Sequence, residues 1–343
     1  MRLMGKSGVI AAAAAVALGA GAAVAQDRKV RIHMQSSFAS SLPLLGADAN
    51  YTVDQIRKLS AGNIDIRFFE PGALVPPGQS FDAVSSGALD AAWATPGYWA
   101  GKDMAFAVFS TVPFGPGIGE YLAWMKEGGG EKLMQALYAR YDIHSVMCHL
   151  SPPKASGWFR KEIKTLEDLK GLKVRFFGLG AHVMEKFGVS TQLLPAGEIL
   201  QALQFGTIDA TEHLGPGFQQ VAKFYYFPGW QRQATVGDLI INKRKWDSLS
   251  PTQKAIIEAS CDQTVLKGIS HGESLQPRAL AEIEGKGVKL VTWGPEFLAA
   301  FRKAWDEVAA EQSARSPEFK KAWDSLSNFR KEYAIWKDRG YLK

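Results

Sequence analysis

The sequence predicts an α/β fold made of two similar lobes, followed by a long helical C-terminal region. Short apolar strands alternate with helices over the first two thirds of the chain, which is typical of mainly parallel sheets. One unit of strand, helix, glycine and strand occurs twice, around GALDA at 87–91 and GTIDA at 206–210. Two copies so far apart do not make a repeat array, so we interpret them as two lobes with a ligand crevice between them.

The first lobe contains the clearest alternation of strands and helices. Polar and apolar residues alternate at 29–34, which predicts a strand. Glycines directly follow two amphipathic stretches, and such glycines commonly end helices. The elements expected after the first strand are a helix at 44–60, a strand at 64–69, a helix at 79–86 and a buried strand at 89–94.

The second lobe repeats this order and is followed by helices. A strand is expected at 174–177, a helix at 198–205 and a strand at 206–210, while extended segments at 156–160 and 233–242 cross between the lobes. Amphipathic helices are expected at 251–273, 275–286, 295–315 and 318–336. The predicted division is a first lobe at 26–154, completed by part of 240–343, a second lobe at 155–240, and a helical region at 250–343 that packs on the lobes.

The N-terminus has the pattern of an export signal. Arg2 and Lys6 precede an uninterrupted run of small apolar residues at 8–24, and Ala-Val-Ala at 23–25 provides a cleavage site before Gln26. We therefore expect a signal peptide at 1–25 and a mature protein in the periplasm. No later apolar stretch reaches the roughly 18 residues that a membrane-spanning helix needs.

Composition excludes several classes of function. The chain has 40 basic and 34 acidic residues without blocks of like charge, and aromatic residues do not alternate with basic clusters, so nucleic acid is not an expected partner. Cys148 and Cys261 are the only cysteines, so structural zinc and thiol redox motifs are absent. Nothing in their spacing brings them together, and two separate buried thiols are favoured over a disulfide.

An enzyme is the alternative to a binding protein. The six histidines show no metal-binding spacing, and the chain lacks the G-x-S-x-G motif of a serine nucleophile. The sequence GPGIG at 115–119 lacks the context of a phosphate-binding loop. A periplasmic enzyme acting on a small carboxylic acid is therefore the weaker hypothesis.

Several segments resemble one family of transport proteins. The stretches SGWFRK at 156–161 and TLEDLKGLKVR at 165–175 resemble the central signature of TRAP solute-binding proteins. Segments 96–103, 112–115, 208–212 with 215–216, and 241–246 resemble the branch that binds keto acids and lactate. The resemblance implies a two-lobed, type II-like periplasmic binding protein that captures an α-keto or α-hydroxy acid without catalysis. It also implies membrane subunits as partners, and leaves homodimerisation through the helical tail open.

The resemblance also implies the residues that bind the solute. Arg175 lies where the family has its carboxylate-binding arginine, and a guanidinium can meet both oxygens of a carboxylate. In this branch, the glutamate at Glu212 and the backbone of the next residue, here His213 in place of tryptophan, hold a metal ion that bridges to the solute. No cofactor is required, and bound Na⁺ or Ca²⁺ is the open question.

Lys154 departs from that pattern, because the branch commonly has a glutamine there. If its ammonium enters the cleft, it replaces the metal ion and binding becomes metal-independent; otherwise it is a solvated loop lysine. Further candidate site residues are one acidic residue and several aromatic side chains for apolar walls. These are Asp238, Tyr98, Phe38 and Trp158.

Overall fold

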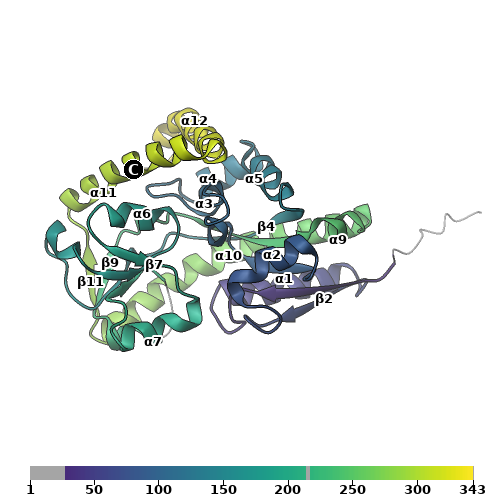
Figure 1. Ribbon diagram of the computed structural model, residues 1–343, viewed down its shortest axis with the longest axis horizontal. Helices are drawn as coiled ribbons and strands as arrows, with labels where there is room; N and C mark the ends of the chain where they lie inside the picture. Colours follow the sequence, from purple (N-terminus) through teal and green to yellow (C-terminus); the bar gives the residue numbers. More distant parts are fainter. Residues whose placement is uncertain (1–27, 214–216, 343) are drawn as a thin grey trace, which may run out of the picture.

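Two β-sheets lie side by side in the computed structural model, which describes residues 28–213 and 217–342. Figure 1 shows the two sheets with their covering helices, and the long helix α10 (Pro251–Gly285) running past both. The two-lobed α/β prediction is therefore confirmed. The expected signal peptide at 1–25 and the motif at 215–216 lie outside the described residues.

The first sheet forms the core of what we call the first lobe. Its strand order is β2-β1-β3-β10-β4. β1 pairs in parallel with β2 and β3, whereas β10 is antiparallel to both of its neighbours. The strands are β1 (Val30–Ser36), β2 (Ile64–Phe69), β3 (Ala91–Ala94), β4 (Ile143–Ser151) and β10 (Thr235–Asn242).

The second sheet forms the core of the second lobe, in the order β11-β9-β5-β8-β6-β7. Strands β7, β6 and β8 are parallel to one another and β11 is parallel to β9, whereas β5 runs antiparallel to β8 and β9. The strands are β5 (Gly157–Phe159), β6 (Lys173–Arg175), β7 (Ser190–Gln192), β8 (Ala210–Thr211), β9 (Phe224–Phe227) and β11 (Lys289–Thr292). The boundary expected at residue 240 falls inside β10, which belongs to the first sheet, and β11 returns to the second sheet from far along the chain.

The repeated sequence unit has the same structural role in both lobes. Gly87 and Gly206 follow the helices α2 (Ser80–Ser86) and α7 (Ile199–Gln204). Their φ angles are 83° and 71°, in the left-handed region that favours glycine. The repeated aspartate then accepts a backbone N–H bond from the neighbouring parallel strand. Asp90 accepts from His33 at 2.9 Å, and Asp209 accepts from Lys173 at 2.9 Å. The shared motif thus joins equivalent strands, and it is explained by the fold alone.

Helices cover the sheets and connect the lobes. The first lobe carries α1 (Leu45–Leu59), α2 (Ser80–Ser86), α3 (Ala105–Ser110), α4 (Ile118–Lys126), α5 (Gly130–Ala139) and α9 (Lys243–Asp247). The second carries α6 (Leu179–Glu185), α7 (Ile199–Gln204) and α8 (Phe218–Val221). Of the C-terminal helices, α11 (Pro295–Arg315) packs on α6, and α12 (Pro317–Gly340) packs on α3. No helix of the described chain combines the length and the apolar character needed to cross a membrane.

The expectation of two helices at 251–273 and 275–286 is wrong, because α10 is continuous through Pro277. The helix starts at a capping box in which Ser250 and Gln253 bond each other's backbone. Its first half packs on β4 and α1, and Leu280 and Ile283 pack into the second lobe. Packing at both ends holds the helix together across the hydrogen bond that proline cannot donate.

A disulfide joins Cys148 of β4 to Cys261 of α10. The expectation of two separate thiols is therefore wrong. The two residues are 113 positions apart, and only the packing of α10 against β4 brings them together. A crosslink closing a loop of that length stabilises the fold by about 4–5 kcal/mol in the chain-entropy model.

Candidate functional site

A small cavity lies between the two lobes and has a volume of about 20 Å³. That is space for about one water molecule, so the lobes are closed upon each other. Both lobes and the two segments that cross between the sheets, residues 152–156 and 228–234, contribute to its wall. The lining residues are Phe38, Leu45, Thr95, Tyr98, Lys154, Arg175, Phe177, His213, Arg232 and Thr235.

Arg175 is the last residue of β6 and is only 1% exposed. Its Nε donates to the backbone carbonyl of Leu194 at 3.2 Å, and its Nη1 donates to Oε1 of Glu212. Arg67, the arginine of the similar first-lobe segment IRFF at 66–69, is exposed on β2. The parallel pairing of β6 with β8 explains the difference, because it places the start of the following loop, and hence Glu212, beside Arg175.

Glu212 is shared by two arginines. Its Oε2 pairs with Nη2 of Arg232, which also donates to the backbone carbonyl of Glu212 at 2.5 Å. All of these groups are buried, and a buried carboxylate is stable only when such partners compensate its charge. The Nε of Arg232 is buried without a hydrogen-bond partner in the described chain, so one donor at the cavity wall remains to be satisfied.

Lys154 lies on the other crossing segment and is 8% exposed, so the alternative of a solvated loop lysine is wrong. Its backbone N–H donates to the carbonyl of Arg232 at 3.4 Å, which joins the two crossing segments. Gly229 allows this close approach, because a Cβ there would lie 1.7 Å from the carbonyl oxygen of Lys154. Burial, and then repulsion from Arg232, lower the pKa of the Lys154 ammonium to about 7, against the attraction of Glu212.

His213 also lines the cavity, but as a neutral side chain. Burial lowers the pKa of its imidazole well below the usual value, and repulsion from Arg175, Arg232 and Lys154 lowers it further.

We call Arg175, Arg232, Lys154 and Glu212 the charge cluster. Two arginines against one carboxylate leave an excess of one positive charge in the cluster, and a protonated Lys154 adds a second.

The first lobe contributes an aromatic and hydroxyl wall. The ring centroids of Phe38 and Tyr98 are 5.7 Å apart, and Tyr98 meets Phe177 of the second lobe edge-on at 5.5 Å. The Tyr98 hydroxyl lies beside the Arg175 guanidinium, and burial raises its pKa. Thr95 donates its hydroxyl to the carbonyl of Val236 at 2.8 Å, which fixes this edge of the wall.

Two of the predicted site residues lie elsewhere. Asp238 is buried in the first sheet, where it accepts from Tyr138 at 2.6 Å and from Ser145 at 3.1 Å. Burial raises the pKa of its carboxyl to about 7. Trp158 stacks on Tyr225 at 4.1 Å inside the core of the second lobe. Alternation explains both, because neighbouring residues of a strand point to opposite faces.

The sequence analysis missed Arg232, Phe177 and Thr95. Arg232 directly precedes the predicted crossing segment at 233–242, and a charged residue entering such a segment was a usable signal. Phe177 follows Arg175 by two positions, the spacing that puts two side chains on one face of an extended chain. Thr95 carries no signal that distinguishes it from other loop threonines.

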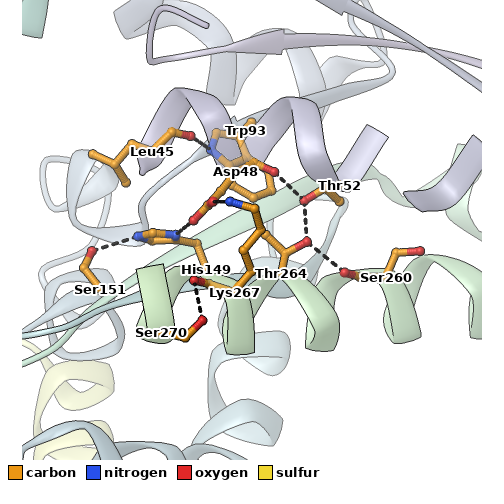
Figure 2. Close-up of polar contacts among 10 residues, drawn as sticks. All are labelled: Leu45, Asp48, Thr52, Trp93, His149, Ser151, Ser260, Thr264, Lys267 and Ser270. Carbon is orange, nitrogen blue, oxygen red and sulfur yellow. Dashed lines mark hydrogen bonds and ion pairs between the residues drawn. The ribbon is translucent and has the colours of Figure 1, made fainter. Parts of the chain in front are cut away.

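A second polar cluster lies beside the first crossing segment (Figure 2). His149 bonds Oδ2 of Asp48 through Nδ1 at 2.8 Å and Oγ of Ser151 through Nε2 at 2.8 Å. Lys267 of α10 pairs with the other Asp48 oxygen at 3.4 Å. The order Asp, His, Ser is that of a hydrolase triad, but Asp48, His149 and Ser151 are completely buried, and none lines the cavity between the lobes. The cluster therefore ties α1, β4 and α10 together next to the point where the chain leaves the first lobe.

Comparisons with known proteins agree with this geometry. The family model for bacterial extracellular solute-binding protein, family 7, matches residues 35–316. A monocarboxylate 2-oxoacid-binding periplasmic protein of Nostoc sp. is 33% identical over 314 residues, covering 90% of this chain and 86% of that protein.

Two solved structures are similar over nearly the whole chain. A TRAP transporter solute-binding protein from Bordetella bronchiseptica, a mixed-occupancy dimer with copurified calcium and picolinate, is 32% identical. Its TM-score is 0.88, covering 90% of this chain and 94% of that one. A TRAP periplasmic solute-binding protein from Pseudoalteromonas atlantica, with bound sodium and pyruvate, is 32% identical with a TM-score of 0.85, covering 90% and 96%. The chain therefore belongs to family 7 of the bacterial extracellular solute-binding proteins, the solute-binding proteins of TRAP transporters.

Proposed function

We propose that this protein captures a small α-keto or α-hydroxy monocarboxylate, aliphatic or aromatic, at the cavity between its lobes, which has to widen beyond its present volume of about 20 Å³ to hold the acid. The observation that carries the proposal is the excess positive charge of the buried charge cluster, together with the unpartnered Nε of Arg232. A carboxylate would neutralise that excess and accept from the free donor. Pyruvate, bound by one relative, is an α-keto acid, and picolinate, bound by another, is an aromatic monocarboxylate.

The proposed roles follow from where each group lies. Arg175 and Arg232 would hold the carboxylate on the second lobe, and Lys154 would add a third donor from the crossing segment. Phe38, Tyr98 and Phe177 would form the walls that exclude water when the lobes close. Closure then depends on contacts made only in the closed state, as in other hinged binding proteins.

Export to the periplasm and delivery of the solute to TRAP membrane subunits complete the proposal. The periplasmic relatives and the expected signal peptide support this location. Homodimerisation is a separate expectation, supported by the dimeric relative from Bordetella bronchiseptica and by the exposed Ile335 and Trp336 of α12. Sedimentation equilibrium of the mature protein tests it.

The test of function is thermal unfolding of the mature protein with pyruvate, lactate, picolinate, malonate and, as a cationic control, ethanolamine. A bound acid at 100 times its dissociation constant stabilises the folded protein by about 2.7 kcal/mol. Stabilisation by a monocarboxylate and none by ethanolamine is the expected result. If no acid stabilises the protein with or without added calcium and sodium, the proposal is wrong.

The enzyme alternative has a specific test of its own. Nuclear magnetic resonance of each stabilising acid, incubated overnight with stoichiometric protein, is expected to show unchanged spectra. Conversion of the acid, abolished in Ser151→Ala, would instead assign catalysis to the buried cluster of Asp48, His149 and Ser151.

A further inference from the structure

The residues around the cavity do not fit a metal ion of the kind that the relatives contain. Within the described residues, no three histidine, cysteine, aspartate or glutamate side chains lie together as a metal site. The expected ligand, Glu212, has one carboxylate oxygen paired with Arg175 and the other with Arg232. Its backbone carbonyl also accepts from Arg232. Each oxygen that a calcium or sodium ion would use therefore already lies against a cationic guanidinium group, which would repel the ion.

The remaining neighbours are also unfavourable for a cation. Arg175, Arg232 and Lys154 all act electrostatically on His213, the residue expected to complete the metal site. All three cationic side chains are less than 9% exposed, so solvent screens little of the repulsion that an added cation would meet.

A count of charges shows why no metal ion is needed. Arg175, Glu212 and a monocarboxylate carry one net negative charge together, which a metal ion or Lys154 was expected to cancel. Arg232 brings that sum to zero by itself, because its guanidinium contacts Glu212 directly. Arg232 thus offers the compensating charge that the sequence analysis expected from Lys154 or from a metal ion.

We infer that solute binding by this protein is independent of metal ions, with Arg232 as the built-in cation that lets Glu212 and a solute carboxylate share one buried site. The inference rests on the proposed function. It makes Arg232 a specificity-determining residue, because a guanidinium offers directed donors that hold a carboxylate in a fixed plane. Relatives with sodium or calcium at their sites would bind the same acids through an ion instead.

The first experiment is calorimetric titration of the wild-type protein with pyruvate, or with picolinate if that acid stabilises it more. One buffer is chelator-treated with choline replacing sodium, and matched buffers contain 1 mM calcium or 100 mM sodium, values on the order of those that saturate extracellular sites. The dissociation constants measured in the three buffers are expected to agree within about threefold, which is less than the loss of one charge-assisted bond would cause. Titration with calcium chloride alone is expected to give no binding heat. Affinity that falls further without metal and returns with it would overturn the inference and leave the proposed function intact.

The second experiment uses two variants. Arg232→Gln is expected to lose at least about tenfold in affinity in chelated buffer, the equivalent of one charge-assisted bond, and to regain part of it with calcium. Wild-type affinity of Arg232→Gln in chelated buffer would refute the role of Arg232. Glu212→Gln, which keeps the side-chain shape and removes the competing negative charge, is expected to bind the acid as tightly as wild type or more tightly. A tenfold loss in Glu212→Gln would show that the carboxylate itself is required, as a metal ligand would be.

Discussion

Arg175→Lys is expected to weaken solute binding strongly with little effect on folding. The Arg175 guanidinium donates to Leu194 through Nε and to Glu212 through Nη1, and the residue lines the cavity. Lysine keeps the charge, but one ammonium cannot hold Glu212 and meet a solute carboxylate in the same plane. The lost charge-assisted bonds correspond to about 1.5–3 kcal/mol, or roughly 10- to 150-fold in dissociation constant.

The control is Arg67→Lys, because Arg67 is an exposed strand arginine of the first lobe that does not line the cavity. Isothermal calorimetry of both variants with the same acid, and urea unfolding of each without it, separate binding from stability. Arg67→Lys should match wild type in both measurements. A dissociation constant of Arg175→Lys within twofold of wild type would refute the reasoning, since Arg175 is buried at the cavity and contacts Glu212, whereas Arg67 is exposed.

Three further predictions concern closure and protonation. Gly97→Ala should weaken binding without unfolding the protein, because the new Cβ would lie 2.4 Å from Cζ of Phe177 across the closed lobes; unchanged affinity would contradict this. Affinity for an acid should fall as the pH rises above about 7, where Lys154 loses its proton, and calorimetry from pH 6 to pH 9 should show a flatter profile for Lys154→Gln. Burial raises the pKa of the Asp238 carboxyl to about 7, so its protonated form stabilises the folded protein. That stabilisation is complete below the pKa that the carboxyl has in the unfolded chain, and it is lost as the pH rises through about 7. In urea unfolding from pH 4 to pH 8, the free energy of unfolding should fall less for Asp238→Asn than for wild type. Identical pH profiles of the two proteins would contradict the role given to the Asp238 carboxyl.

The fold was predictable because local patterns determine most of it. Strand β2 has the predicted bounds, and the glycine after α2 ends that helix as expected. The repeated GALDA and GTIDA segments proved to be one structural device used twice, with aspartate fixing the neighbouring strand. Such features depend on residues close in sequence, which periodicity and capping rules describe well.

Contacts between distant segments were not predictable in the same way. The disulfide between Cys148 and Cys261 depends on how α10 packs on β4, and no spacing rule encodes that packing. The continuity of α10 through Pro277 likewise depends on both lobes holding its ends. We expected a break at residue 274, and tertiary packing keeps the helix continuous instead.

The candidate site shows the same division. Arg175, Lys154, Glu212, Tyr98 and Phe38, which the family resemblance suggested, come together around one cavity or its charge cluster. The charge balance could not be predicted, because it depends on which cations reach Glu212 from elsewhere in the chain. One unrecognised arginine changed the expected electrostatics of the whole site.

The position of that arginine also bears on how binding and closure are coupled. Arg232 and Lys154 lie on the two crossing segments, and their backbones bond each other at 3.4 Å. A carboxylate held by these side chains is therefore attached to the hinge itself as well as to the second lobe. In this closed structure, the wall from the first lobe, Phe38 and Tyr98, lines the same cavity as the cations of the charge cluster. Because each contact across the cavity is available only in the closed state, a solute that satisfies both the cations and the wall shifts the population toward that state by its differential affinity. An anion without a side chain to meet the aromatic wall would neutralise the cations equally well, yet it would gain less from closure.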